Sequence, residues 1–141
     1  MVGFVLVSHG GMAKGMLEAL EMITGVTEQI AAFGLYEGES PDSLLDTIKE
    51  QLPVLDDGSG VLFFVDMFGA SPFNTCARIF LENQEKYALI CGMNLPMLLE
   101  LALQREGQSV DELAQMAVTN GKESVTRFEL KSMEMQINNI I

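Results

Sequence analysis

The chain has 141 residues, of which 48% are hydrophobic and 20% are charged. This length suits one domain, and this composition favours a compact core over disorder, a collagen-like repeat or a disulfide scaffold. The formal net charge of −12 at pH 7 repels nucleic-acid phosphates and anionic lipids, so we expect neither as a partner. A basic protein is the better electrostatic match.

Short apolar runs alternate with segments of helical periodicity along the chain. The apolar runs are residues 1–8, 28–36, 61–67 and 87–92. They lack polar alternation, as is typical of strands covered on both faces. The expected helices are residues 12–24, 41–52, 71–82, 95–106 and 109–124. In the first of them, helical spacing predicts a core-facing apolar side formed by Met12, Met16, Leu20 and Ile23. Capping residues support them, with Ser40, Ser71 and Ser109 as expected N-caps and Gly25 as an expected C-cap.

This alternation predicts an α/β fold, a doubly wound three-layer α/β/α sandwich with a mostly parallel sheet of order 2-1-3-4. Residues 125–130 could add a last strand. We assign residues 1–130 to one domain and residues 131–141 to a C-terminal tail, because the tail has no clear place in the pattern.

The two cysteines, Cys76 and Cys91, lie in apolar surroundings without CxxC spacing. They are interpreted as buried free thiols of a protein from a reducing compartment. A single histidine and two distant cysteines predict no zinc site, and we expect no metal and no cofactor. No apolar run reaches the ~18 residues of a membrane span, and the first residues do not resemble a signal peptide. The sequence therefore indicates a cytoplasmic protein.

Polar residues with chemical potential follow the first and third expected strands. His9, the only histidine, ends the first, and Asp66 ends the third. In a sheet of order 2-1-3-4 these strands are neighbours, so the two side chains emerge together at the carboxyl edge. A carboxylate that accepts the Nδ1–H of histidine leaves Nε2 free as a nucleophile or general base. Alternatively, His9 merely terminates a strand.

An anion site is expected beside this pair. Gly69, Ala70 and Ser71 lead into a helix N-terminus, whose free N–H groups favour a phosphate or carboxylate. Ser71 could donate its hydroxyl to the anion or simply cap its own helix. Gly10 could allow close backbone approach or only make the turn after the first strand.

Two further features near this edge stay open. Met67, Phe68 and Phe73 could form a docking surface that excludes water, or could belong to the core. Residues 92–96 could line the rim of the crevice or form an ordinary turn before a helix.

Two other classes of function compete with a histidine-centred site. Ser71, His9 and Asp66 are the residue types of a serine hydrolase triad, although the GxSxG pattern is broken at its last position. A non-catalytic nucleotide- or flavin-binding module is the second alternative, but no GxGxxG follows the first strand. A receiver domain fits the size but lacks the acidic pair expected after its first strand.

The chain resembles a known family through three motifs in order. They are VLVSHGG with the following helix, GVLFFVDMFGASPFN and GMNLPMLLE. Together they resemble the EIIA component of the mannose/fructose/sorbose class of the bacterial phosphoenolpyruvate-dependent sugar phosphotransferase system. The resemblance covers about residues 1–125.

The resemblance implies that His9 accepts a phosphoryl group from the carrier protein HPr and passes it to a histidine of EIIB. Asp66 would hydrogen-bond His9, and Ser71 would lie near the phosphate. EIIB would be a separate chain, and the membrane components EIIC and EIID would take part indirectly in uptake of a mannose-class sugar. The family fold implies a homodimer that exchanges an antiparallel edge strand, for which residues 125–130 are the candidate. Phe68 stands where some members have Trp.

Overall fold

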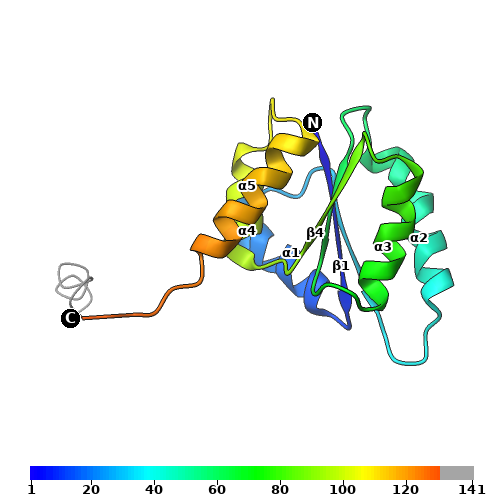
Figure 1. Cartoon of the computed structure of the whole chain (residues 1–141), viewed down its shortest axis with the longest axis horizontal. Helices are drawn as coiled ribbons and strands as arrows, with labels where there is room; N and C mark the ends of the chain where they lie inside the picture. Colours follow the sequence, from blue (N-terminus) through cyan, green and yellow to red (C-terminus); the bar gives the residue numbers. More distant parts are fainter. Residues whose placement is uncertain (131–141) are drawn as a thin grey trace.

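The computed structural model describes residues 1–130. Within them, strands and helices alternate through the first eight elements, and a final helix follows (Figure 1). The strands are β1 (Gly3–His9), β2 (Ile30–Leu35), β3 (Val61–Val65) and β4 (Tyr87–Cys91). The helices are α1 (Met12–Thr24), α2 (Pro41–Leu55), α3 (Ser71–Glu82), α4 (Leu95–Gln104) and α5 (Val110–Glu123).

The four strands pair in parallel in the order β2-β1-β3-β4. Helices α2 and α3 cover one face of the sheet, and α1, α4 and α5 cover the other (Figure 1). The predicted α/β/α sandwich and its strand order are therefore confirmed. The carboxyl ends of β1 and β3 lie side by side, since Val7 is in register with Val65.

The alternation of side chains along each central strand divides the core into two. In β1, Phe4 and Leu6 pack beneath α1, α4 and α5, while Val5 and Val7 pack beneath α2 and α3. All four side chains are fully buried. Burial on both faces explains why these strands lack polar positions.

Helix ends follow the expected capping chemistry in most places. Ser40 and Ser109 accept hydrogen bonds from the N–H groups of Asp42 and Glu112, and Gly25 ends α1 in a left-handed conformation. The boundaries differ at two helices, because α2 continues through Pro53 to Leu55 and α4 ends at Gln104 rather than residue 106. Strand β3 ends at Val65, which leaves Asp66 outside the ladder.

The expected apolar face of α1 is only partly correct. Leu20 is fully buried and Met16 packs against the core, but Met12 and Ile23 are 43% and 61% exposed. Both lie near the ends of the helix, where the neighbouring elements no longer cover it.

Residues 125–130 form no strand in the described chain, so the expected last strand is absent from this single chain. The segment leads away from the body after α5 (Figure 1), and Val125, Phe128 and Leu130 are exposed. A strand needs the hydrogen-bonding groups of a neighbouring strand, and none of the four described strands pairs with these residues. The tail assigned to residues 131–141 lies outside the described residues.

A buried arginine fixes the edge of the sheet opposite the carboxyl ends. Arg105, 2% exposed, donates to the backbone carbonyl groups of Val2, Glu28 and Gln29 and lies over the ring of Phe4. It thereby joins the chain after α4 to the beginnings of β1 and β2.

In residues 1–130 no helix has the length and apolar character needed to span a bilayer.

Candidate functional site

The candidate site is formed where two neighbouring strands end. His9 is the last residue of β1, and Asp66 directly follows β3. Since the two strands are parallel and adjacent, the expected juxtaposition of these residues is present in the structure.

Asp66 holds His9 through one carboxylate oxygen. Its Oδ2 lies 2.6 Å from His9 Nδ1 and also accepts the backbone N–H of His9 at 2.9 Å. The other oxygen, Oδ1, accepts the N–H of Met67 at 2.9 Å. With a neutral imidazole, this geometry requires the proton on Nδ1 and leaves the lone pair on Nε2. The ring is therefore oriented both by its own hydrogen bond and by the backbone that carries it.

The two side chains differ in their access to solvent. That of His9 is 52% exposed, whereas that of Asp66 is only 11% exposed. Burial alone would raise the pKa of Asp66, but the hydrogen bonds from the His9 backbone and ring and from Met67 outweigh it and place this pKa below its ordinary value. The site thus pairs an accessible imidazole with a shielded carboxylate that stays ionised.

The N-terminus of α3 presents unused donors. Ala70 is the N-cap in an extended conformation and makes no side-chain capping bond. The backbone N–H groups of Ser71 and Phe73 have no acceptor among the described residues, and Pro72 has no N–H. Free donors at a helix N-terminus are suited to an anion.

The expectation that Ser71 caps this helix is wrong. Ser71 is the first helical residue, one position after the cap, and its hydroxyl makes no hydrogen bond with any described residue. The hydroxyl is therefore free for a ligand. It also makes no bond to His9, so the structure does not assemble the hydrogen-bonded triad of the serine hydrolase alternative.

The apolar residues after Asp66 lie largely on the surface. Met67 and Phe68 are 55% and 75% exposed, and Phe73 is half-buried with its ring centroid 4.6 Å from that of Phe68. Met12, which begins α1 after the His9 turn, is a further exposed apolar residue, although its helical spacing predicts a place in the core. Its position as the first residue of the helix, directly after the turn that follows His9, is the signal that could have identified it.

The segment 92–96 supports the site from behind. The N–H groups of Gly92 and Met93 donate to the carbonyl of Val65, immediately before Asp66. Asn94 caps α4 by accepting the N–H of Met97. This is the ordinary turn before a helix, and it also anchors the end of β3.

The cysteines do not extend the site. Both are free; Cys76 is buried in the α2–α3 layer and Cys91 is partly buried beside it. Burial raises the pKa of each thiol, which keeps both protonated and weakly nucleophilic.

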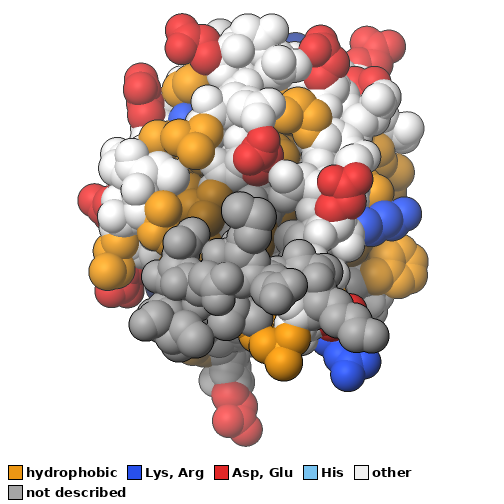
Figure 2. Space-filling model, turned by 90° about the vertical axis from the view of Figure 1, so that its left-hand side faces the viewer, with side chains coloured by type: hydrophobic (Ala, Val, Ile, Leu, Met, Phe, Trp, Pro, Cys, Tyr) orange, Lys and Arg blue, Asp and Glu red, His pale blue; other side chains and the backbone are white. Residues whose placement is uncertain are grey.

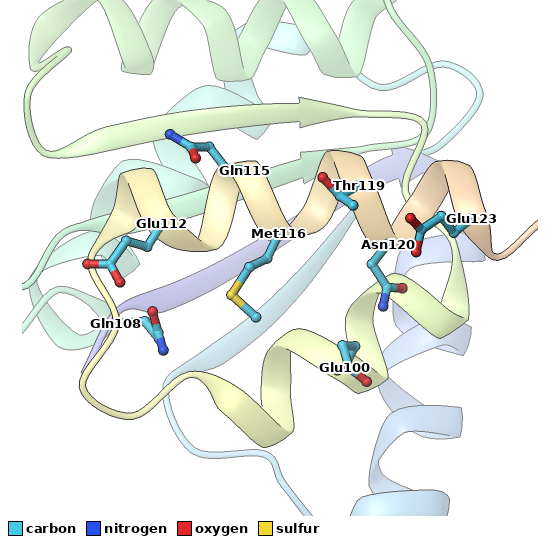
Figure 3. A pocket seen from close by; sticks show the side chains of 8 residues that line it. All are labelled: Glu100, Gln108, Glu112, Gln115, Met116, Thr119, Asn120 and Glu123. Atoms are coloured by element: carbon cyan, nitrogen blue, oxygen red, sulfur yellow. The ribbon is translucent and has the colours of Figure 1, made fainter.

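A sizeable hollow lies elsewhere, between α4 and α5 (Figure 3). Its volume is about 510 Å³, and it is lined by Glu100, Glu112, Glu123, Met116 and Asn120 among others. Figure 2, seen from the α4–α5 side, shows acidic side chains scattered among apolar ones. The hollow contains neither His9 nor Asp66 and brings no nucleophile next to a base.

The fold and this edge site define a histidine-bearing α/β domain, and comparison with known proteins identifies its family. Residues 3–118 match the EIIA-man family, described as "PTS system fructose IIA component". The chain therefore belongs to this family of EIIA components of the sugar phosphotransferase system, as the motif resemblance indicated.

Curated relatives are also EIIA-containing components of phosphotransferase systems. The chain is 37% identical over 134 residues to the mannose-specific EIIAB component of Escherichia coli (strain K12). The aligned residues cover 94% of this chain and 41% of that protein. It thus spans less than half the length of that relative. It is 30% identical over 113 residues to the fructose-specific EIIA component of Bacillus subtilis (strain 168), covering 80% of this chain and 77% of that one.

Solved structures show the same fold. A phosphotransferase system component EIIA from Streptococcus agalactiae superposes with a TM-score of 0.82 at 28% identity, covering 91% of this chain and 98% of that one. The mannose/sorbose-specific IIA subunit from Enterococcus faecalis gives a TM-score of 0.78 at 26% identity, covering 92% and 96%.

The lowered pKa of Asp66 makes a pH-dependent contribution to stability. The folded state holds the proton more weakly than the unfolded state, so the contribution is full above the ordinary pKa of 3.8 and is lost as the pH falls through the lower folded value. We expect Asp66→Asn to lower the free energy of unfolding at pH 7, and the difference from the wild type to shrink below pH 3.8. Urea unfolding across this range measures it.

Asp46→Asn is the matched control, because Asp46 is exposed on α2 and makes no hydrogen bond with a described residue. It should give a small difference at every pH. A gap for Asp66→Asn that stays constant from pH 7 to pH 3 would contradict the assigned role of the carboxylate.

Proposed function

We propose that this chain is a phosphoryl carrier of a sugar phosphotransferase system, which accepts a phosphoryl group from phospho-HPr on His9 and passes it to a histidine of EIIB. The observation that carries the proposal is the His9–Asp66 pair, in which Nδ1 is held at 2.6 Å and the exposed ring offers its other nitrogen. Membership of the EIIA family supports it.

The transfer needs positioning more than elaborate covalent chemistry. Nε2 of His9 attacks the phosphorus of the donor phosphohistidine, the donor's N–P bond breaks, and its imidazole leaves with the electron pair. The Nδ1 proton of His9 stays in place, and Asp66 stabilises the positive charge that develops on the ring. The second transfer, to EIIB, is the same step with His9 as the leaving group.

The phosphoryl oxygens would be received at the N-terminus of α3. Ser71 offers its hydroxyl and N–H, and the turn through Gly69 and Ala70 leads into this helix without a side-chain cap. Gly10 follows His9 and lets the backbone approach the phosphate without a side chain. These donors stabilise negative charge without reorganising during the transfer.

Replacing His9 is the direct test. His9→Ala should abolish labelling by phosphoenolpyruvate, enzyme I and HPr, whereas Asp66→Asn should fold and be labelled about 10- to 1,000-fold more slowly, because the wrong tautomer is populated. Mass spectrometry locates the phosphate, which should be lost in acid and kept in alkali. Labelled His9→Ala protein would eliminate His9 as the acceptor, and Asp46→Asn should behave as the wild type.

Met67, Phe68 and Phe73 would form the docking surface for HPr and EIIB. Exposed apolar side chains beside a reactive group suit a contact that excludes water from a labile phosphohistidine. The net charge of −12 favours partners with basic surfaces.

Phe68→Ala should raise the KM for phospho-HPr about 10-fold and leave kcat nearly unchanged, because it removes binding without altering the histidine pair. Steady-state transfer kinetics measure this. Val54→Ala is the control, since Val54 is 82% exposed on the last turn of α2. Equal KM values for the two variants would place the docking surface elsewhere.

We also propose that the chain is a homodimer in which residues 125–130 pair with a strand of the partner. Within residues 1–130 the outer edges of β2 and β4 pair with no further strand, and Phe128 and Leu130 expose apolar surface that pairing would cover. The protein would act in the cytoplasm, with EIIC and EIID downstream, in uptake of a mannose-class sugar.

Phe128→Asp should shift the protein from dimer to monomer, because it places a charge where apolar surface is to be buried. Sedimentation equilibrium at micromolar concentration measures the shift, with Val54→Asp as the control for an added surface charge. A wild-type monomer, or a variant that dimerises as the wild type does, would count against the strand exchange.

A further inference from the structure

Ser8, the residue before His9, ties together the two ends of the turn that carries the histidine. Its side chain is fully buried, and its hydroxyl accepts the N–H of Ala13 at 2.8 Å and donates to the carbonyl of Gly10 at 3.4 Å. The N-cap position of α1 is Gly11, which has no side chain to cap the helix. The hydroxyl of Ser8 therefore replaces the missing cap from the preceding strand.

Gly34 supports the same turn from β2. It is in register with Ser8 across the β1–β2 ladder. A Cβ at this position would lie 2.2 Å from the carbonyl oxygen of Gly10, a distance that real contacts do not allow. The carbonyl of Gly10 thus lies directly over the backbone of Gly34, and a side chain larger than hydrogen would push it away.

The backbone of Gly10 is accordingly fixed by three groups, which contact the two peptide units that Gly10 joins. Its carbonyl is held between the hydroxyl of Ser8 and the backbone of Gly34. Its N–H donates to the carbonyl of Leu35 at 2.8 Å, and its φ of 55° is one that side-chain-bearing residues rarely adopt. These contacts fix the chain both where it enters Gly10 and where it leaves it.

We propose that Ser8 and Gly34 are positioning residues of the transfer site, which act on His9 through the carbonyl of the following residue, Gly10. The inference rests on the proposed function. The Gly10 carbonyl belongs to the peptide unit that Gly10 shares with Gly11, and the Gly10 N–H to the unit that it shares with His9. The two units meet at the Gly10 α-carbon, so a displaced carbonyl shifts this atom and with it the backbone of His9. Because the N–H and the ring of His9 share a single acceptor oxygen on Asp66, a rotation that weakens one bond also misaligns the other.

Loss of this alignment should affect transfer more than binding. A displacement of about 1 Å at a reacting atom can lower a rate about 100-fold. Met67 and Phe68, the proposed docking residues, belong to the loop after β3 rather than to this turn, and Met67 is held by the other oxygen of Asp66, Oδ1. We therefore expect kcat to fall while the KM for phospho-HPr stays close to that of the wild type.

The experiment compares Ser8→Ala and Gly34→Ala with the wild-type protein. Each variant should lower kcat for transfer from phospho-HPr about 10- to 100-fold, with KM changed less than about 2-fold. In the unphosphorylated protein, the imidazole ¹⁵N and Nδ1-proton NMR signals should change from one ordered tautomer to a tautomer mixture. A purely structural loss of stability in a protein that is still folded would not move these signals.

Two controls make the same chemical changes away from the turn. Ser109→Ala removes a capping hydroxyl that accepts the N–H of Glu112 at the start of α5. Gly15→Ala adds a methyl group on α1 where no heavy atom lies within 4 Å. Both should retain the wild-type kcat and the wild-type imidazole signals.

The outcomes separate this inference from the proposed function. A wild-type protein that takes no phosphate from phospho-HPr defeats the proposed function, whereas the NMR comparison is still decided without any donor. Wild-type transfer rates together with an unchanged tautomer in Ser8→Ala overturn the role of Ser8, and the same result in Gly34→Ala overturns that of Gly34. If either variant fails to fold, the other decides the proposal.

Discussion

One carboxylate oxygen, Asp66 Oδ2, accepts hydrogen bonds from both the ring and the backbone of His9, and the rest of the site depends on this double contact. It requires two strands that end side by side and run in the same direction, which β1 and β3 do at the centre of a parallel sheet. The buried, uninterrupted strands hold these ends in register from below. Only the last residue of one strand and the first beyond the other are then free to carry chemistry.

The residues that support the site are buried, whereas the groups that could react are exposed. Behind the carboxyl edge, fully buried side chains such as Val7 and Val65 and the bonds from Gly92 and Met93 fix the strand ends. In front of it lie an exposed imidazole and free N–H groups on α3. The hollow between α4 and α5 has a volume of about 510 Å³ but does not pair a nucleophile with a base. The volume of a hollow alone is therefore a poor guide to function in this fold. An exposed imidazole at an open edge of the sheet is accessible to a macromolecule as well as to a small ligand.

The sequence predicted most of the fold because continuous apolar strands and regular helix spacing are local signals. The juxtaposition of His9 and Asp66 followed from strand order. The features that the sequence did not predict depend on contacts between residues distant in the chain. The exposure of Met12 follows from where α1 outruns its neighbours, and an unpaired segment at 125–130 cannot be a strand alone. The cap of α3 falls on Ala70 instead of Ser71 because the extended residue, not the best hydrogen-bond acceptor, begins the helix here.

Arg105 gives the two edges of the sheet different sensitivities to acid. Its three acceptors are all backbone carbonyl groups, which do not take up protons in the acid range, whereas the carboxyl edge is joined by an ionised side chain. The edge held by Arg105 also carries the ion pair of the Met1 amine with Asp57, whose pKa lies well below its ordinary value. Acid that protonates Asp66, below its ordinary pKa of 3.8, weakens the hold on His9 while the guanidinium keeps its carbonyl acceptors. At such a pH, amide hydrogen exchange should accelerate at the His9 turn before it does at the beginnings of β1 and β2.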